Sequence, residues 1–237
     1  MIKINRLHAE AKRRLNRVFS DHEAALTTVD LDSYFNHAKE ILLENYSAIV
    51  EKNRTLSDRM KSLEIKNYKL EKLEENSKST IFKLPKDHYS TLNRYCYAKA
   101  KTCSVSEQVF VNNIQTHKIE ESLRDPLNTP SFNWRETFSN EDSKGLHVYH
   151  NNVMGIDEVY IDYIKWVPDV AFVSAVKGTY INQEGNAVTK NKHLEIDDPL
   201  LWRKIVDIAE YLIKKDFDQN YRATIDSILF NEKVYIN

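Results

Sequence analysis

The sequence predicts an α+β fold in which N- and C-terminal helices form one bundle that carries an inserted, mainly antiparallel β domain. Apolar residues recur at helical spacing near both ends of the chain, and they alternate every second residue through its middle. The predicted parts are an N-terminal helical part at residues 1–78, the β domain at 79–192 and a C-terminal helical part at 193–237.

The first segment predicts an amphipathic helix over residues 2–19 with one basic side. Residues 1–20 hold six basic residues against a single carboxylate, Glu10, although the whole chain has a net charge of only −1. This cluster is a candidate surface for facing DNA or a channel, and a solvated helix side that balances an acidic neighbour explains it equally well. The candidate residues are Lys12, Arg13, Arg14 and Arg17.

A second apolar stripe predicts a helix that Asp30 or Asp32 can cap and that runs to about residue 52, and two continuations of it are possible. Apolar residues at 35, 42, 49, 56, 63 and 70 recur every seven residues, which is the pattern of a coiled coil. Thr55 followed three residues later by Asp58 is instead a helix-start signature, which predicts a break near Asn53 and a separate short helix to about Leu63. The pattern does not decide between a continuous and a broken helix.

Alternating runs predict strands between residues 80 and 190, and a last pair of helices follows them. The clearest run, "DEVYIDYIKWVP", places Val159, Ile161 and Tyr163 on one side. Asp198 before Pro199 is expected to cap a helix whose buried stripe begins at Leu201. Residues 221–230 predict a further short helix.

The stretch "RDPLNTPS" at residues 124–131 predicts a stiff, exposed elbow after a short helix. Because a residue before proline is pushed toward extended geometry, Asp125 and Thr129 are expected to hold the chain open. A preorganised extended segment loses little entropy on docking, so the elbow suits a contact with a neighbouring subunit, as well as a loop that crosses its own sheet. The subunit-contact candidates are Arg124, Asp125, Pro126, Pro130 and Trp134.

No catalytic, metal-binding or cofactor-binding motif is recognisable in the sequence. His147 and His150 are three residues apart in an expected strand, which points them to opposite sides, and His88 stands alone. The acidic group Glu195, Asp197 and Asp198 is explained by the start of a helix. Cys96 and Cys103 are expected to be free, buried thiols. We therefore expect no enzyme activity, no cofactor and no metal.

The sequence also gives no sign of export or of membrane insertion. No apolar run approaches the roughly 18 residues that a membrane span needs, and no signal-peptide pattern is present. The chain is therefore expected to be made and kept in a cytosol, with no membrane partner.

Five segments occur in an order that resembles the adaptor or tail-ring proteins of short-tailed phages, particularly crAss-like and related phages of Bacteroidales. They are "DLDSYFNHAKEIL", "FKLPKDHYSTLN", "HKIEESLRDPLNTPS", "EVYIDYIKWVPDV" and "HLEIDDPLLWRKIVDIAEYLI". The resemblance spans about residues 20 to 215. The extra residue before the proline in "YIKWVP" and the form of "LEIDDP" depart from the family pattern.

The resemblance implies a structural virion protein, assembled in the host cytoplasm as a twelve-fold connector ring. Its partners would be other copies of itself, the portal and other tail proteins, and ejected DNA would pass through the ring with only transient, non-specific contact. The family also favours the helix break near Asn53. The alternative function is a cytosolic nucleic-acid-binding or regulatory protein that dimerises through the heptads at 42–70.

Overall fold

The computed structural model describes residues 2–15, 26–100, 105–173, 180–181, 187–217 and 225–230. Within it the chain divides into two compact units. The terminal unit consists of Met1–Leu63 and Val167–Asn237, and the sheet unit consists of Glu64–Trp166. Arg17 and Cys103, both named in the sequence analysis, lie outside the described residues.

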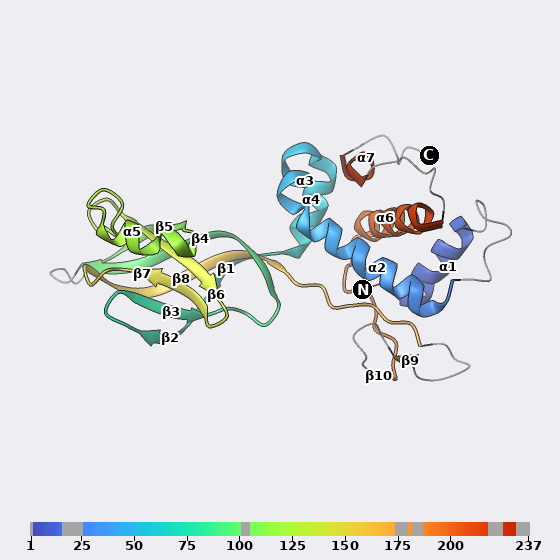
Figure 1. Ribbon diagram of the computed structural model, residues 1–237, viewed down its shortest axis with the longest axis horizontal. Coiled ribbons are helices and arrows are strands. Elements are labelled where there is room, and N and C mark those ends of the chain that lie inside the picture. The colour runs from blue at the N-terminus through green and yellow to red at the C-terminus, as the bar shows by residue number, and fades with distance from the viewer. Residues whose placement is uncertain are drawn as a thin grey trace. The chain divides into compact units, whose positions relative to one another are not determined.

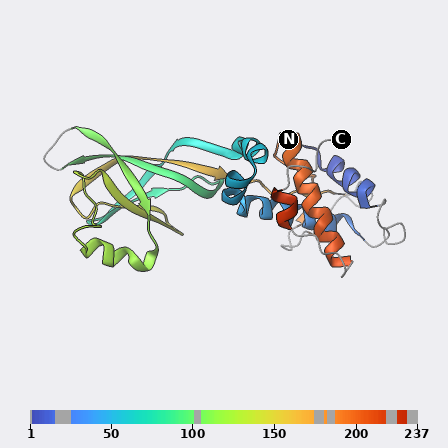
Figure 2. The ribbon, with the colours of Figure 1, turned by 90° about the horizontal axis from the view of Figure 1, so that it is seen from above.

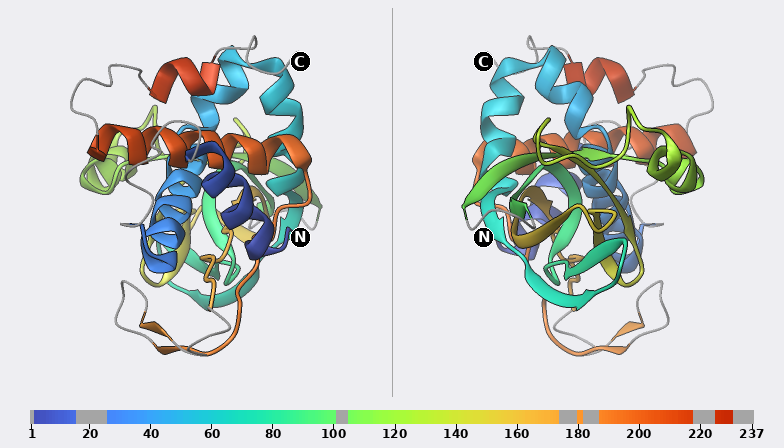
Figure 3. Two further views of the ribbon diagram at one scale, coloured as in Figure 1. Left: turned by 90° about the vertical axis from the view of Figure 1, so that its right-hand side faces the viewer. Right: turned by 90° about the vertical axis from the view of Figure 1, so that its left-hand side faces the viewer.

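The terminal unit is built around one long helix, α6. Its described helices are α1 (Ile4–Leu15), α2 (Thr28–Glu44), α3 (Tyr46–Lys52), α4 (Arg54–Met60), α6 (Pro199–Phe217) and α7 (Ile225–Phe230). Helix α6 contacts α1, α2, α4 and α7 (Figures 1 and 3). The buried stripe expected from Leu201 to Leu212 is confirmed. The expected cap is also confirmed, because Asp198 Oδ1 accepts hydrogen bonds from the backbone N–H groups of Leu200 and Leu201 at 2.8 and 3.2 Å.

The helix breaks near Asn53, the alternative that the spacing left open and the resemblance favours, and Asn53 itself makes the break. Helix α3 ends at Lys52, and Asn53 has φ −130° and ψ 89°, outside the helical region. Its side chain accepts a hydrogen bond from Leu56 N at 2.9 Å and donates one to the Leu229 carbonyl at 3.0 Å. The cap of α4 is therefore Asn53 and not Thr55. The continuous heptad helix to residue 70 does not form, since residues 64–69 are a strand.

The sheet unit is one eight-stranded sheet with a single parallel pair. Its strands are β1 (Glu64–Lys69), β2 (Glu71–Glu75), β3 (Ser79–Lys83), β4 (His88–Ala100), β5 (Ser106–Asn113), β6 (Glu136–Asp142), β7 (Gly145–Tyr149) and β8 (Met154–Lys165). Their order is β1-β8-β4-β5-β6-β7-β3-β2, and only β5 and β6 are parallel. A parallel pair needs a long return connection, and residues 114–135 provide it.

The sheet must curl because the single residue Leu70 links its two edge strands. Strands β1 and β2 lie at opposite edges of the sheet, yet only Leu70 separates them in sequence. The outer strands of a flat eight-stranded sheet would be about 34 Å apart at the usual strand spacing, whereas two chain steps span only about 7 Å. The sheet must therefore bend until its edges approach each other (Figure 2). The residues inside the curl form its core, among them Leu70, Phe82, Cys96, Val109 and Ile161.

The predicted fold class, a terminal helical bundle with an inserted, mainly antiparallel β domain, is wrong. The structure is mostly an eight-stranded, curled, mixed sheet with few and mostly short helices. The prediction overestimated helix because the heptad pattern runs through residues that join the sheet as β1. It also missed β2, whose five residues are all exposed and therefore show no two-residue alternation of apolar side chains.

Two smaller features complete the described fold. Strands β9 (Tyr180–Ile181) and β10 (Ala187–Val188) pair in an antiparallel two-stranded sheet of the terminal unit. No helix among the described residues is long and apolar enough to span a membrane.

Candidate functional site: the surface around the proline elbow

The β5–β6 connection begins with two short helices that fix its position on the sheet. They are η3 (Thr116–Lys118) and α5 (Ile119–Arg124). Ile119 and Leu123 on α5 pack against Phe138 of β6, with Ile114 and Tyr149 beside them. This small cluster is separate from the core inside the curl, and Figure 2 shows α5 on the outside of the sheet.

The elbow itself is a tight turn, so the expectation that it holds the chain open is wrong. Asp125 is extended, with φ −79° and ψ 117°, as the following proline requires. Its carbonyl then accepts hydrogen bonds from Asn128 N at 3.1 Å and Thr129 N at 2.9 Å. Its carboxylate also accepts one from Leu127 N at 2.9 Å. These bonds fold the segment back, because an aspartate at the first position of a turn can bind its own backbone.

The folded elbow forms one wall of a groove of about 570 Å³. The other walls come from the end of β5, the start of β6 and the turn before β8. Its apolar members include Leu127, Trp134 and Val153, whose exposed fractions are 93%, 81% and 45%. Its further lining includes Asn112, Ile114, Pro126, Pro130 and Phe138. A tryptophan and a leucine this exposed beside a groove are unusual for the surface of a monomeric protein without a partner.

Of the predicted contact residues, Pro126, Pro130 and Trp134 line this groove, whereas Arg124 and Asp125 do not. Arg124 is exposed at the end of α5, where its guanidinium lies 3.8 Å from Glu120. Pro126 is exposed and lines the groove, whereas Pro130 lines it from a buried position. Trp134 is held at its backbone, whose N–H donates to Ser131 Oγ at 3.3 Å, and its ring is left free for contact.

Sequence reasoning missed Leu127 and Val153, which are as much a part of the groove as Trp134. The signal for Leu127 was present in the sequence: an apolar residue lies between two prolines that prevent it from joining a helix or a central strand. No comparable signal exists for Val153, because its place follows from the pairing of β8 with β4.

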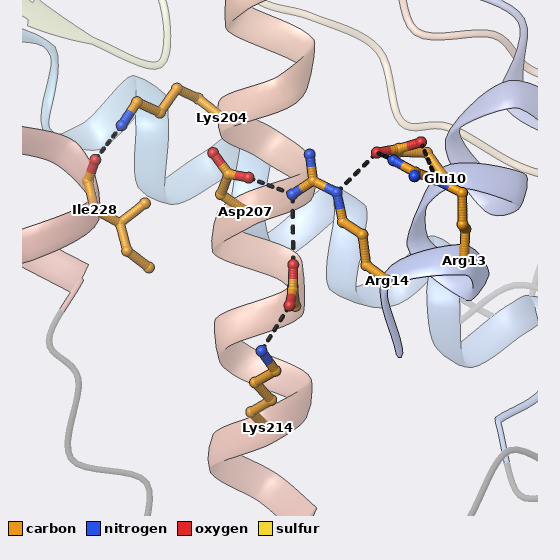
Figure 4. Close-up of polar contacts among 8 residues, drawn as sticks. Glu10, Arg13, Arg14, Lys204, Asp207, Lys214 and Ile228 are labelled. Atoms are coloured by element: carbon orange, nitrogen blue, oxygen red, sulfur yellow. Dashed lines mark hydrogen bonds and ion pairs between the residues drawn. The ribbon is translucent and has the colours of Figure 1, made fainter. Parts of the chain in front are cut away.

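The basic cluster of the first helix lies in the terminal unit, and its members differ in how far their charge is available. Lys12 is exposed. Arg13 pairs with Glu10 at 2.7 Å while its side chain stays 56% exposed. Arg14 is held between Glu10 of α1 and both Asp207 and Glu210 of α6 (Figure 4). Arg14 therefore links α1 to α6 through ion pairs.

These contacts shift the ionisation of the groups involved. The hydrogen bond from Arg13, together with Arg14, lowers the pKa of Glu10 to about 2. Burial raises the pKa of Asp207, and the hydrogen bond from Arg14 opposes that shift. Figure 4 also shows Lys204 donating to the carbonyl of Ile228, a contact that joins α6 to α7. The arrangement is that of a buried polar connection between helices.

The histidines and cysteines do not assemble a reactive centre in the described part of the chain. No group of three or more His, Cys, Asp or Glu side chains there is placed to hold a metal ion. His147 Nε2 lies 3.0 Å from Asp142, and His88 Nε2 lies 2.8 Å from the hydroxyl of Thr91. Cys96 is buried in the sheet core as expected, and burial raises the pKa of its thiol to about 12. Such a thiol is inert.

Two comparisons with known proteins found no match. No family model matches the chain, and none of the curated proteins matches it.

Proposed function

We propose that this chain is a non-enzymatic structural subunit of the connector between the portal and the tail of a short-tailed phage. Copies of it would form a closed ring, twelve-fold in the family that it resembles, through which DNA passes. The proposal rests on the five ordered segments of that resemblance and on the groove beside the elbow.

The exposure of Leu127 and Trp134 is the observation that supports this proposal most. Tryptophan is the residue type most enriched among side chains that dominate protein interfaces, and it works best beside a pocket that excludes water. The hydrogen bonds of Asp125 hold the elbow in one conformation, so little entropy is lost when it docks. A ring is built from heterologous contacts, in which one face of a subunit meets a different face of the next. The elbow groove is a candidate for one of these faces.

The basic helix has a limited role in this proposal. Lys12 and Arg13 are exposed, so they can contribute to the electrostatic potential along a DNA path. Arg14 is committed to carboxylates of its own chain. Any contact with DNA would be with phosphates, would lack sequence preference and would weaken as salt rises.

Mass photometry and negative-stain imaging of the purified chain, alone and mixed with the portal protein of the same virus, test the proposal. Rings are expected for the native chain. The variant Leu127→Ser with Trp134→Ala should remain a folded monomer with an almost unchanged melting temperature, because both side chains are exposed, and should fail to form rings.

The matched control is Leu73→Ser, which removes another exposed leucine, 51% accessible on β2 and absent from the lining of the elbow groove. It should form rings like the native chain. A native chain that stays monomeric under all these conditions would refute the ring. Rings that survive the double variant would refute the elbow as the contact.

A further inference from the structure

A second groove lies at one end of the curled sheet and is lined almost entirely by polar side chains. It has a volume of about 550 Å³. Its walls are the start of β4, the link from β5 into η3, and the end of β6. Its lining includes Arg94, Asn113, Gln115, Thr116 and Glu141. The mouths of closed and curled sheets are common places for ligands.

Arg94 reaches this groove from the inner face of the sheet. It lies two residues before Cys96 on β4, so both side chains point to the same face, and Cys96 belongs to the core inside the curl. The Arg94 side chain is 9% exposed. The sheet interior therefore ends in a guanidinium that has lost most of its contact with water.

The hydrogen bonds of Arg94 within the described residues involve only one of its three guanidinium nitrogens. Nη1 donates to Ser139 Oγ at 2.9 Å and to Asn113 Oδ1 at 3.3 Å. Glu141 is the carboxylate beside it, with Oε1 3.2 Å from Nη2, yet that oxygen makes no aligned hydrogen bond with any described group. Nε has no hydrogen-bond acceptor there either. Burial lowers the pKa of Arg94, and the Glu141 charge only partly opposes this.

The other polar groups of the groove mostly donate. Asn113 uses its side-chain oxygen to accept a hydrogen bond from Arg94, which leaves its amide N–H groups for a ligand. Gln115 and Thr116 add further donors at the rim. Burial lowers the pKa of nearby His88, and His117 is exposed. A ligand that reaches Arg94 and Asn113 must therefore supply acceptors.

We propose that the mouth of the curled sheet binds a carboxylate, with Arg94 as its main anchor. A planar carboxylate can accept two parallel hydrogen bonds from the Nε and Nη2 groups of a guanidinium. Charge-assisted bonds of this kind are stronger than neutral ones. Glu141 competes with the ligand for the positive charge of Arg94, although its Oε1 is not aligned to accept a hydrogen bond. This inference concerns the sheet unit alone and is independent of ring formation.

The test is a titration of the full chain, labelled with ¹⁵N, with sodium acetate, followed at the Arg94 Nε–H resonance at constant ionic strength. Saturable shifts are expected at Arg94 and at the side-chain amide of Asn113. Inorganic phosphate should bind more weakly than acetate. A non-saturating response to acetate, or tighter binding of phosphate, would overturn the assignment.

Glu141→Gln gives the sharpest variant, because it removes the competing charge without enlarging or shrinking the groove. Acetate should bind about three- to tenfold more tightly to it, as expected when one close like charge is removed from a partly buried site. Arg94→Lys keeps the charge but loses the planar fork, so affinity should fall about tenfold. Arg135→Gln, which removes an exposed arginine 2.8 Å from Glu107, is the matched control and should leave acetate binding unchanged.

Two peptides distinguish the possible sources of the carboxylate. One has an internal glutamate and an amidated end, and the other has a free C-terminal carboxylate and no acidic side chain. Competition with acetate by either one supports the site and identifies the source. If Glu141→Gln fails to tighten acetate binding although its spectrum remains native, the carboxylate site is refuted.

Discussion

Arg14 contacts carboxylates of two helices, whereas its neighbour Arg13 pairs with a carboxylate of its own helix. The contributions of the two arginines to stability can therefore be measured separately. Arg14 contacts Glu10 of its own helix and Asp207 and Glu210 of α6, while only 21% of its side chain is exposed. Arg14→Gln should lower the free energy of unfolding by about 1–3 kcal/mol, because it leaves the buried Asp207 without its donor. Urea unfolding monitored by circular dichroism measures this loss.

Arg13→Gln serves as the comparison for that variant. Its side chain is mostly exposed and pairs with Glu10 alone among the described residues, so the free energy of unfolding should stay almost unchanged. Equal losses in the two variants would mean that the Arg14 contacts contribute nothing beyond a surface ion pair.

Glu10 should produce a measurable dependence of stability on pH. Because the folded pKa is lowered from 4.5 to about 2, its contribution is fully present above pH 4.5 and is lost as the pH falls toward 2. Asp207 has its pKa shifted in the opposite direction, so the two groups partly cancel in the native chain. The difference between the native chain and Glu10→Gln isolates Glu10. Unfolding measured from pH 7 to pH 2 should show that difference constant at first and vanishing at the acid end.

At the scale of elements, the β6–β7 hairpin depends on a glycine that no other residue can replace easily. Gly145 has φ +142°, and a Cβ at this position would lie 2.2 Å from the Phe82 carbonyl oxygen of β3. Asp142 Oδ1 completes the turn by accepting hydrogen bonds from the N–H groups of Lys144 and Gly145. Gly145→Ala should therefore destabilise the protein by at least about 2 kcal/mol.

Gly155→Ala is the control for the hairpin, since a Cβ there would meet no heavy atom within 4 Å. Thermal unfolding of both variants should show a large loss for Gly145→Ala and less than about 1 kcal/mol for Gly155→Ala. A small effect at Gly145 would show that β3 can move away from the turn.

At the scale of the whole molecule, the sheet unit is one continuous segment of the chain. The terminal unit consists of the two segments that precede and follow it in sequence. Glu64 pairs with Ile164 across β1 and β8, so the ends of the sheet unit lie next to each other. Paired Cα atoms of antiparallel strands are about 4.5–5.5 Å apart. A short linker can therefore replace residues 64–166 without stretching the remaining chain.

We expect each unit to fold without the other. Residues 64–166 alone should unfold in one cooperative step, and the chain with Leu63 joined to Val167 through a short Gly-Ser linker should keep the helix content of the terminal unit. Circular dichroism and amide dispersion in NMR spectra check both. Loss of cooperative unfolding in either piece would show that the two units stabilise each other.

The features that the sequence predicted correctly at these scales are those that a few neighbouring residues determine. The cap at Asp198 and the buried stripe of α6 depend on hydrogen bonds and spacing within one or two turns. Asn53 also shows the limit of such reasoning, because Thr55 has the same chemistry and lies two residues away. The contact with Leu229, 176 residues further along, comes from tertiary structure.

The sequence by itself determined the cap and buried stripe of α6, the run of strands in the middle and the burial of Cys96, because hydrophobic spacing is a local property. Only the tertiary structure decided that residues 64–75 are strands, that the sheet curls at Leu70, that the elbow folds back and that Arg94 lies at the mouth of the curl. Each of these depends on strand pairing between distant segments. Such pairing is selected by backbone hydrogen bonds and by the surface buried inside the sheet, neither of which is encoded in the spacing of nearby residues.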